Sequence, residues 1–330
     1  MLEHGGRLQR AIEHYGIARE EWLDLSSGIA PWAFTIPDIP LRAWARLPET
    51  DDGLEQAAAA YYGAAPLLPV AGSQAAIQAL PQLRALGTVG VLSPCYAEHA
   101  EGWRRAGHRL LELQEEQIEQ ALDSLDVLVV VNPNNPTGRL VPAEQLLAWH
   151  ERLARRGGWL LVDEAFMDNT PAHSIAAHTG RPGLIVLRSF GKFFGLAGVR
   201  LGFVLAEAPL LRRLAELLGP WTVSGPTRIL GQACLLDSAA HRSQIARCAD
   251  ASRRLASVMS AAGFAPTGGC DLFQYRVTEH AARLHEFMAR RGILLRLFTA
   301  PASLRFGLPA TDEDFQRLLQ AFNDYSKEHP

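Results

Sequence analysis

Short apolar runs alternate with longer stretches of mixed polarity through the middle of this chain. Residues 127–131 (VLVVV) have the length and composition of a strand buried on both faces of a parallel sheet. Residues 142–156 begin with proline, a residue favoured in the first turn of a helix. Further short apolar runs occupy residues 67–70, 89–92, 159–163, 184–187 and 202–205. The alternation predicts an α/β fold whose large domain has a mostly parallel sheet flanked by helices.

The last third of the chain predicts a smaller α+β domain. Residues 219–226 contain two glycines and two prolines and indicate a hinge. A long helical stretch at 227–262 leads to short strands near 272–277 and 293–297 and helices near 279–291 and 311–325. A single core rarely grows beyond about 250–300 residues. We therefore expect an irregular N-terminal arm (1–46) packing on the small domain or active site, a large domain (47–219) and a small domain (220–330).

Composition and charge argue against several classes of partner. A net charge of -3 offers no basic surface to a nucleic acid. No run approaches 18 apolar residues, and residues 1–7 lack the apolar segment of a secretory signal, so we expect no membrane partner. The four cysteines are scattered without a CxxC pair, which is typical of reduced thiols. These features indicate a cytoplasmic protein.

Polar side chains follow four of the predicted strands. Tyr96 comes after residues 89–92, Asn135 after 127–131, Asp163 ends 159–163 and Lys192 follows 184–187. Each has an ordinary explanation alone, such as a rim tyrosine, a turn, a helix cap or a surface lysine. Because the carboxyl ends of parallel strands meet at one sheet edge, the four together predict a ligand site there. Metal binding is disfavoured, since no cluster of ligands at suitable spacing accompanies the aspartate.

Other residues are candidates on local grounds. Ser73 begins a predicted helix, where it serves as an N-cap, helps to bind an anion, or does both. Lys192 lies among apolar residues, which favour a neutral, nucleophilic amine. Arg305, flanked by apolar residues, either pairs with a buried acid or binds an anionic ligand. His4 precedes two glycines that allow close approach of a backbone to a ligand, the alternative being a flexible terminus.

The loop 132–138, Asp163, the stretch 189–192 and Arg200 together resemble the fold-type-I pyridoxal-phosphate enzymes of the class I/II aminotransferase group. The resemblance covers nearly the whole chain and implies pyridoxal 5'-phosphate as cofactor. It implies that Lys192 forms the Schiff base and that Asp163 pairs with the ring nitrogen, keeping the ring an electron sink. Tyr96 would stack on the ring and Asn135 would contact its hydroxyl. The implied phosphate-binding residues are Ser73, Gln74, Ser189 and Arg200.

Four further segments, 4–6, 23–27, 163–166 and 220–223, resemble the threonine-phosphate decarboxylases of cobalamin biosynthesis. That subgroup implies a homodimer that decarboxylates L-threonine O-3-phosphate, a small-molecule substrate, to (R)-1-aminopropan-2-ol O-phosphate. His4 is then the candidate for the substrate phosphate, and Arg305 for one of the substrate anions. The alternative is a histidinol-phosphate-type aminotransferase, in which Lys192 would remove the Cα proton instead.

The sequence departs from the group at three places. Relatives carry an asparagine-containing segment where this chain has residues 27–31, and a tyrosine that reaches the partner subunit's cofactor phosphate where it has 47–52. Phe166 stands where aminotransferases often have tyrosine, and the missing hydroxyl favours the decarboxylase. A cofactor-binding protein without activity is disfavoured because Lys192, Asp163 and Arg200 are all retained.

Overall fold

The computed structural model describes residues 4–329, which divide into two compact units. The larger unit comprises residues 34–135 and 140–242. The smaller unit comprises residues 4–33, 136–139 and 243–329. The domain limits predicted from the sequence, 1–46, 47–219 and 220–330, stay a prediction.

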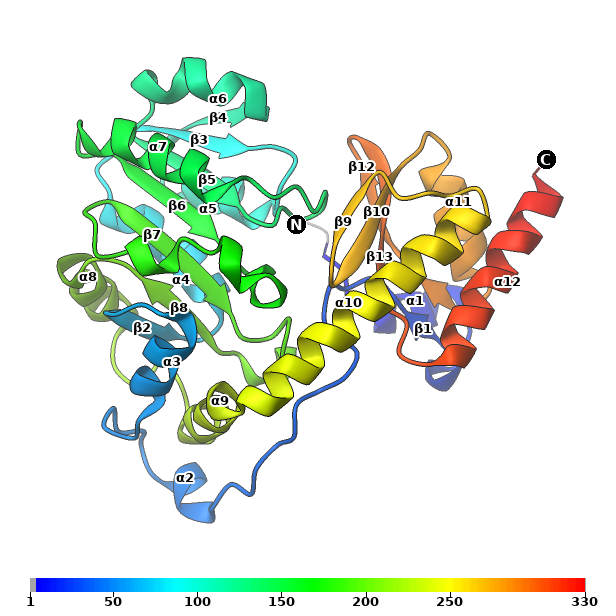
Figure 1. Cartoon of the computed structure of the whole chain (residues 1–330), viewed down its shortest axis with the longest axis horizontal. Helices are drawn as coiled ribbons and strands as arrows, with labels where there is room; N and C mark the ends of the chain where they lie inside the picture. The colour runs from blue at the N-terminus through cyan, green and yellow to red at the C-terminus, as the bar shows by residue number, and fades with distance from the viewer. Residues whose placement is uncertain (1–3, 330) are drawn as a thin grey trace. The chain divides into compact units, whose positions relative to one another are not determined.

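The larger unit is built on a seven-stranded sheet with the order β2-β8-β7-β6-β5-β3-β4 (Figure 1). Strands β3 to β7 pair in parallel, whereas β8 is antiparallel to both β2 and β7. The predicted α/β fold with a mostly parallel sheet is confirmed. The strands are β2 (Leu67–Val70), β3 (Thr88–Leu92), β4 (Arg109–Leu113), β5 (Val127–Val131), β6 (Trp159–Asp163), β7 (Leu184–Ser189) and β8 (Gly202–Leu205).

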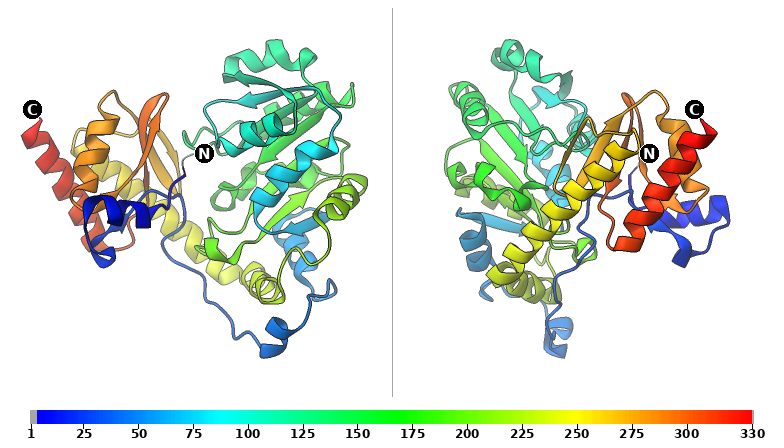
Figure 2. Two further views of the ribbon diagram at one scale, coloured as in Figure 1. Left: turned by 180° about the vertical axis from the view of Figure 1, so that it is seen from behind. Right: turned by 45° about the vertical axis from the view of Figure 1, so that its right-hand side comes forward.

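Helices cover both faces of this sheet. On one face, side chains of α4, α5 and α8 pack on alternate strand residues such as Val129, Leu161 and Leu187 in one buried apolar core. Helices α4 and α5 lie in front of the sheet in the left view of Figure 2. The helices of the unit are α2 (Leu41–Ala45), α3 (Leu54–Tyr62), α4 (Ser73–Ala79), α5 (Glu98–Arg105), α6 (Glu115–Ala121), α7 (Ala143–Ala154), α8 (Ala208–Leu218) and α9 (Gly225–Leu236).

The smaller unit confirms the predicted α+β composition. Its four-stranded antiparallel sheet has the order β12-β13-β10-β9, and β1 pairs in parallel with β11. Helix α10 (Ser238–Ala261) begins in the larger unit and continues into the smaller one. The other elements are α1 (Leu8–Tyr15), β1 (Leu23–Asp24), β9 (Gly268–Cys270), β10 (Phe273–Val277), α11 (Ala281–Ala289), β11 (Ile293–Leu294), β12 (Arg296–Thr299), β13 (Ala302–Gly307) and α12 (Asp312–Glu328).

Two local expectations are wrong. The first 46 residues are not uniformly irregular, because α1 packs Ala11 into the unit and its Tyr15 hydroxyl donates to Glu286 Oε2 at 2.6 Å. The long helical stretch at 227–262 is interrupted at Asp237, which ends α9. Its carboxylate accepts a hydrogen bond from the Ala240 N–H at 2.9 Å, so this side chain caps the start of α10.

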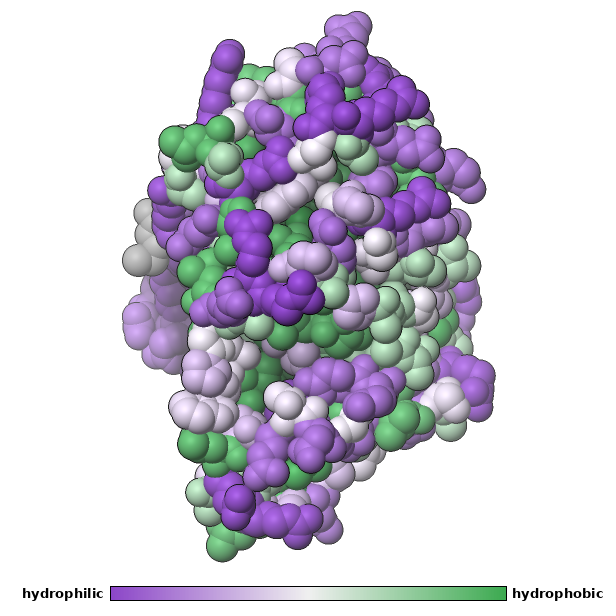
Figure 3. Space-filling model, turned by 90° about the vertical axis from the view of Figure 1, so that its left-hand side faces the viewer, coloured by the Kyte–Doolittle hydropathy of each residue, from purple (hydrophilic) through white to green (hydrophobic). Residues whose placement is uncertain are grey.

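Polar side chains cover most of one face of the molecule. On the face in Figure 3, hydrophilic side chains predominate and hydrophobic ones show between them. Among residues 4–329, every helix is too short or too polar to cross a lipid bilayer.

Candidate active site

The larger unit contains a cavity at the carboxyl ends of β5, β6 and β7. The structure brings together in its wall all eight residues expected to contact a cofactor. They are Ser73, Gln74, Tyr96, Asn135, Asp163, Ser189, Lys192 and Arg200. The predicted edge of the sheet is therefore where these side chains meet, and their individual roles remain predictions.

The pleat of the sheet explains why polar groups gather here. Successive strand side chains point to opposite faces, so residues two apart share a face. Asp163 and Ser189 continue the face that Leu161 and Leu187 bury under the helices. The apolar stripes of the core thus end, at the sheet edge, in a carboxylate and a hydroxyl.

A histidine holds the carboxylate of Asp163 in place. Asp163 is 3% exposed, and its Oδ2 lies 2.8 Å from Nε2 of His99, which is itself buried in α5. The other oxygen, Oδ1, accepts from the Ala165 N–H at 3.0 Å. A carboxylate fixed in this way suits a protonated ring nitrogen. His99 was missed by sequence reasoning, and its one signal is its position three residues after Tyr96, in the first turn of the helix that follows.

Buried aromatic rings anchor the segment that carries Lys192. Phe190, Phe193 and Phe194 are fully buried, and the rings of Phe190 and Phe194 stack with centroids 4.1 Å apart. The Lys192 side chain is half-buried, and its Nζ lies 5.9 Å from the ring centroid of Phe166, which also lines the cavity. The amine therefore projects from a rigid turn beside an apolar surface.

Two glycines leave room for hydrogen-bond donors at the end of the cavity formed by Ser73 and Arg200. A Cβ on Gly72 would lie 2.5 Å from Arg200 Nη2, and one on Gly202 would lie 2.5 Å from the Ser73 backbone nitrogen. Ser73 is not an N-cap, because Gly72 occupies that position and Ser73 is the first helical residue. Hydroxyl, guanidinium and backbone N–H donors in this arrangement fit a phosphate.

Tyr96 is fixed by the neighbouring amide of Gln74. Its hydroxyl donates to Gln74 Oε1 at 3.2 Å, and Gln74 Nε2 donates to Glu98 Oε2 at 2.9 Å. Burial raises the pKa of Tyr96 to about 12, and the charges of Glu98 and Asp163 act in the same direction. The phenol is therefore protonated at neutral pH, and its hydrogen bond to Gln74 fixes the orientation of the ring at the cavity wall.

Asparagine side chains stiffen the loop that presents Asn135. Asn132 is fully buried, donates from Nδ2 to the Val141 carbonyl at 3.1 Å and accepts from the Val141 N–H at 2.8 Å. Asn134 Nδ2 donates to the Pro94 carbonyl at 2.8 Å. The Asn132 bonds hold the two ends of the loop after β5 together, and the Asn134 bond ties this loop to the loop after β3. Asn135, the next residue, lines the cavity.

The two predicted substrate residues lie in the smaller unit, where Ser26 links their surroundings. Arg305 is buried and donates from Nη2 to the Ser26 carbonyl at 3.0 Å. The Gly6 N–H, two residues after His4, donates to Ser26 Oγ at 2.8 Å, and a Cβ on Gly5 would overlap the Ser26 carbonyl. Burial lowers the pKa of Arg305 to about 10, and the charge of Arg296 adds to this effect. The glycines thus allow close packing on Ser26.

The residues lining the cavity fit pyridoxal 5'-phosphate. A buried carboxylate, a primary amine, an aromatic wall and a group of anion-binding donors match its ring nitrogen, carbonyl carbon, planar ring and phosphate. The two glycines give the phosphate donors space that a side chain would fill.

Comparisons with known proteins agree with this fit. The model of the aminotransferase class I and II family matches residues 41–322. The threonine-phosphate decarboxylase of Pseudomonas aeruginosa is 63% identical over 318 residues, covering 96% of each chain. A threonine-phosphate decarboxylase from Sinorhizobium sp is 42% identical over 328 residues, covering 97% of each.

A solved structure shares the fold. The histidinol-phosphate aminotransferase from Sinorhizobium meliloti in complex with pyridoxal-5'-phosphate superposes with a TM-score of 0.85 at 19% identity, covering 100% of this chain and 96% of that chain. The family resemblance noted in the sequence is confirmed: the chain belongs to the class I/II aminotransferase family.

Proposed function

We propose that this protein is a pyridoxal-phosphate-dependent decarboxylase that converts L-threonine O-3-phosphate to (R)-1-aminopropan-2-ol O-phosphate and CO2. The observation that carries the proposal is the 63% identity, over nearly the full length of both chains, to the threonine-phosphate decarboxylase of Pseudomonas aeruginosa. The cavity lined by all eight expected residues is in accord with it. The corresponding place in metabolism is cobalamin biosynthesis.

The residues of the cavity have separate roles in binding the cofactor and in proton transfer. When bound, pyridoxal phosphate supplies a carbonyl carbon for amines and a ring that accepts the electron pair left by the departing carboxylate. Asp163, held by His99, keeps a proton on the ring nitrogen. Lys192 holds the cofactor through Nζ and afterwards supplies a proton to Cα. Ser73, Gln74, Ser189 and Arg200 bind the phosphate.

Packing around the cavity supports this division. Tyr96 and Phe166 present aromatic surface to it, and Phe166 is only 4% exposed. Because phenylalanine lacks a hydroxyl, it donates no hydrogen bond to the ring oxygen, and Asn135 is left as the polar contact proposed there. His4 and Arg305 are our candidates for the substrate's anionic groups, which a histidine cation and a guanidinium can bind.

We also propose a cytoplasmic homodimer. Seven large apolar side chains of the larger unit are exposed to solvent by more than half: Ile36, Leu41, Trp44, Leu47, Leu86, Trp221 and Leu236. Trp221 lies beside Pro48 and Val223 in a cleft, so a second copy of the chain has apolar surface to cover. Replacing Trp44 and Trp221 together by glutamate should convert the dimer to a monomer, as measured by analytical ultracentrifugation. The proposed cytoplasmic location rests on the four scattered cysteines of the sequence, which form no CxxC pair.

The proposed reaction is tested by CO2 release. Purified protein is incubated with pyridoxal phosphate and L-threonine O-3-phosphate, with no keto acid present. We expect CO2 and the amino alcohol phosphate in equal amounts. The Lys192→Ala variant should lose at least about 100-fold in rate, the scale of a lost proton-transfer group. Amino-group transfer from histidinol phosphate to 2-oxoglutarate, without CO2, would instead establish the aminotransferase.

A further inference from the structure

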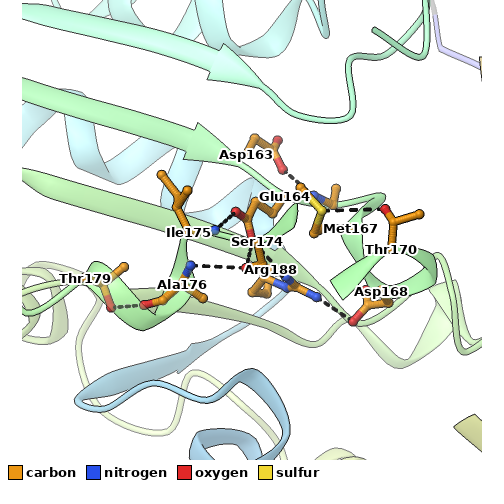
Figure 4. Close-up of polar contacts among 11 residues, drawn as sticks. Asp163, Glu164, Met167, Asp168, Thr170, Ser174, Ile175, Ala176, Thr179 and Arg188 are labelled. Carbon is orange, nitrogen blue, oxygen red and sulfur yellow. Dashed lines mark hydrogen bonds and ion pairs between the residues drawn. The ribbon is translucent and has the colours of Figure 1, made fainter. Parts of the chain in front are cut away.

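Arg188 forms a buried ion cluster with two carboxylates, one of which directly follows Asp163 of the cavity wall (Figure 4). Its Nη1 lies 2.8 Å from Glu164 Oε2 and its Nη2 lies 2.7 Å from Asp168 Oδ1. All three residues are at most 2% exposed. The guanidinium also lies over the ring of Tyr62, 4.6 Å from its centroid.

The cluster is costly to bury. It holds two carboxylates against one guanidinium, and burial raises the pKa of Glu164 although Arg188 opposes that effect. Glu164 recovers hydrogen bonds from Ser174 Oγ at 2.5 Å and from the Ile175 N–H at 2.9 Å. Apolar residues of similar volume are often as stabilising as a buried ion cluster. Stability alone therefore gives a weak reason for these charges.

The position of the cluster relative to the cavity gives a better reason for burying these charged residues. Arg188 lies on the sheet face opposite to Ser189, because the two are neighbours in β7. Glu164 directly follows Asp163 at the end of β6, and its side chain meets Arg188 on that same opposite face. Arg188 is accordingly not among the residues that line the cavity, and any influence on the cavity has to pass through the backbone.

One guanidinium closes the segment 164–168 into a loop. Glu164 and Asp168 are its two ends, and Ala165 and Phe166 between them line the cavity. The Glu164 N–H also donates to the Leu187 carbonyl at 2.9 Å, which joins the end of β6 to β7. The segment after β6 is thereby fixed against the strand that leads to Ser189 and Lys192.

We propose that Arg188 is a positioning residue, which sets Asp163 and Phe166 relative to Ser189 and Lys192 for binding of pyridoxal phosphate. The inference rests on the proposed function, since it takes that cofactor to bind in the cavity. A bidentate guanidinium can hold two carboxylates at a fixed separation, whereas a lysine ammonium is a point charge and cannot.

The test compares two Arg→Lys variants. Arg228 is the matched control, because it is also a buried arginine bridging two carboxylates, Asp52 and Glu55, with contacts of 2.6 Å to each. Pyridoxal phosphate is titrated into each apoprotein well below its melting temperature, and the dissociation constant is read from the visible absorbance. We expect Arg188→Lys to weaken binding about tenfold or more, as loss of a group that orients a ligand does in metal sites. Arg228→Lys should stay within about twofold of wild type.

A second variant removes the charges altogether. Arg188→Met combined with Glu164→Gln and Asp168→Asn leaves no buried charge unpaired. If Arg188→Lys does not fold, the affinity of this triple variant for pyridoxal phosphate is measured instead. Weaker binding by the folded variant supports the positioning role. Unchanged binding, or equal weakening by Arg228→Lys, overturns it. Failure of the wild-type protein to bind the cofactor would overturn the proposed function itself, and the inference with it.

Discussion

Asp163 is the residue on which the chemistry most depends. It is the last residue of β6, and both of its oxygens are engaged, one by His99 and one by the Ala165 N–H. The carboxylate therefore has one orientation and, in this buried place, little water to screen its charge. A fixed negative charge here favours a protonated ring nitrogen over a neutral one.

Replacing Asp163 by asparagine should lower kcat by about 100-fold or more, because the amide keeps the shape but removes the charge. The measurement is the steady-state rate of CO2 release at saturating cofactor and substrate. Asp126→Asn serves as control, since Asp126 accepts from the Thr88 N–H away from the cavity. A kcat within threefold of wild type for Asp163→Asn would contradict the assigned role.

Cys95 provides a prediction about pH. Burial raises its pKa from 9.0 to about 12, and Asp163 and Glu112 act in the same direction. The folded protein thus binds this proton more tightly than the unfolded chain does. The resulting stability is complete below about pH 9 and is lost as the pH rises toward 12. Between pH 8 and pH 10, wild-type apoprotein should lose about 1 kcal/mol more unfolding free energy than Cys95→Ala. Urea unfolding at the two pH values measures this, and identical losses would refute it.

At the scale of elements, the antiparallel strand β8 completes the site. Its first residue, Gly202, pairs with both Ser189 on β7 and Val70 on β2. The two neighbouring strands lead to the hydroxyls of Ser189 and Ser73, so the lack of a side chain at Gly202 lets them converge.

Gly202→Ala should therefore disturb phosphate binding. The new Cβ would lie 2.5 Å from the Ser73 backbone nitrogen and 2.9 Å from the Arg188 carbonyl oxygen. We expect destabilisation by about 1–3 kcal/mol and a weaker affinity for pyridoxal phosphate, both from overpacking. Thermal unfolding and cofactor titration measure the two effects. The control is Gly198→Ala, because a Cβ there meets no atom within 4 Å. Equal behaviour of the two variants would contradict this account.

The sequence predicted the elements whose pattern is local. Residues 127–131 and 159–162 are recognisable as buried strands because each segment is an unbroken run of apolar residues. Strand β4 was not predicted, since Arg109 and Glu112 are exposed and interrupt its apolar pattern. Strand β13 and the break at Asp237 were also missed, because strand pairing and a cap depend on neighbours that a single segment does not show.

The same distinction holds for the site. Lys192, Asp163 and Asn135 could be predicted because each follows a strand in an unusual local sequence. His99 was missed because its partner, Asp163, is 64 residues away in the chain. Arg188 was missed because it ends an apolar run and its carboxylates come from the loop after β6, a contact that exists only in the folded chain.

For the whole molecule, the account rests on which bond at Cα is broken. Decarboxylation removes the carboxylate, keeps the original Cα hydrogen and adds one proton, which we assign to Lys192. Transamination removes the Cα hydrogen and keeps the carboxylate. Both reactions fit the same fold, so the products, rather than the architecture, decide between them.

The most direct measurement is therefore the reaction of L-threonine O-3-phosphate in D2O, followed by NMR of the products. The account predicts an amino alcohol phosphate that retains the original hydrogen and carries one deuterium on the carbon bearing the amine, with CO2 released in equal amount. A product with two deuterium atoms on that carbon, or a keto acid phosphate formed without CO2, would contradict it.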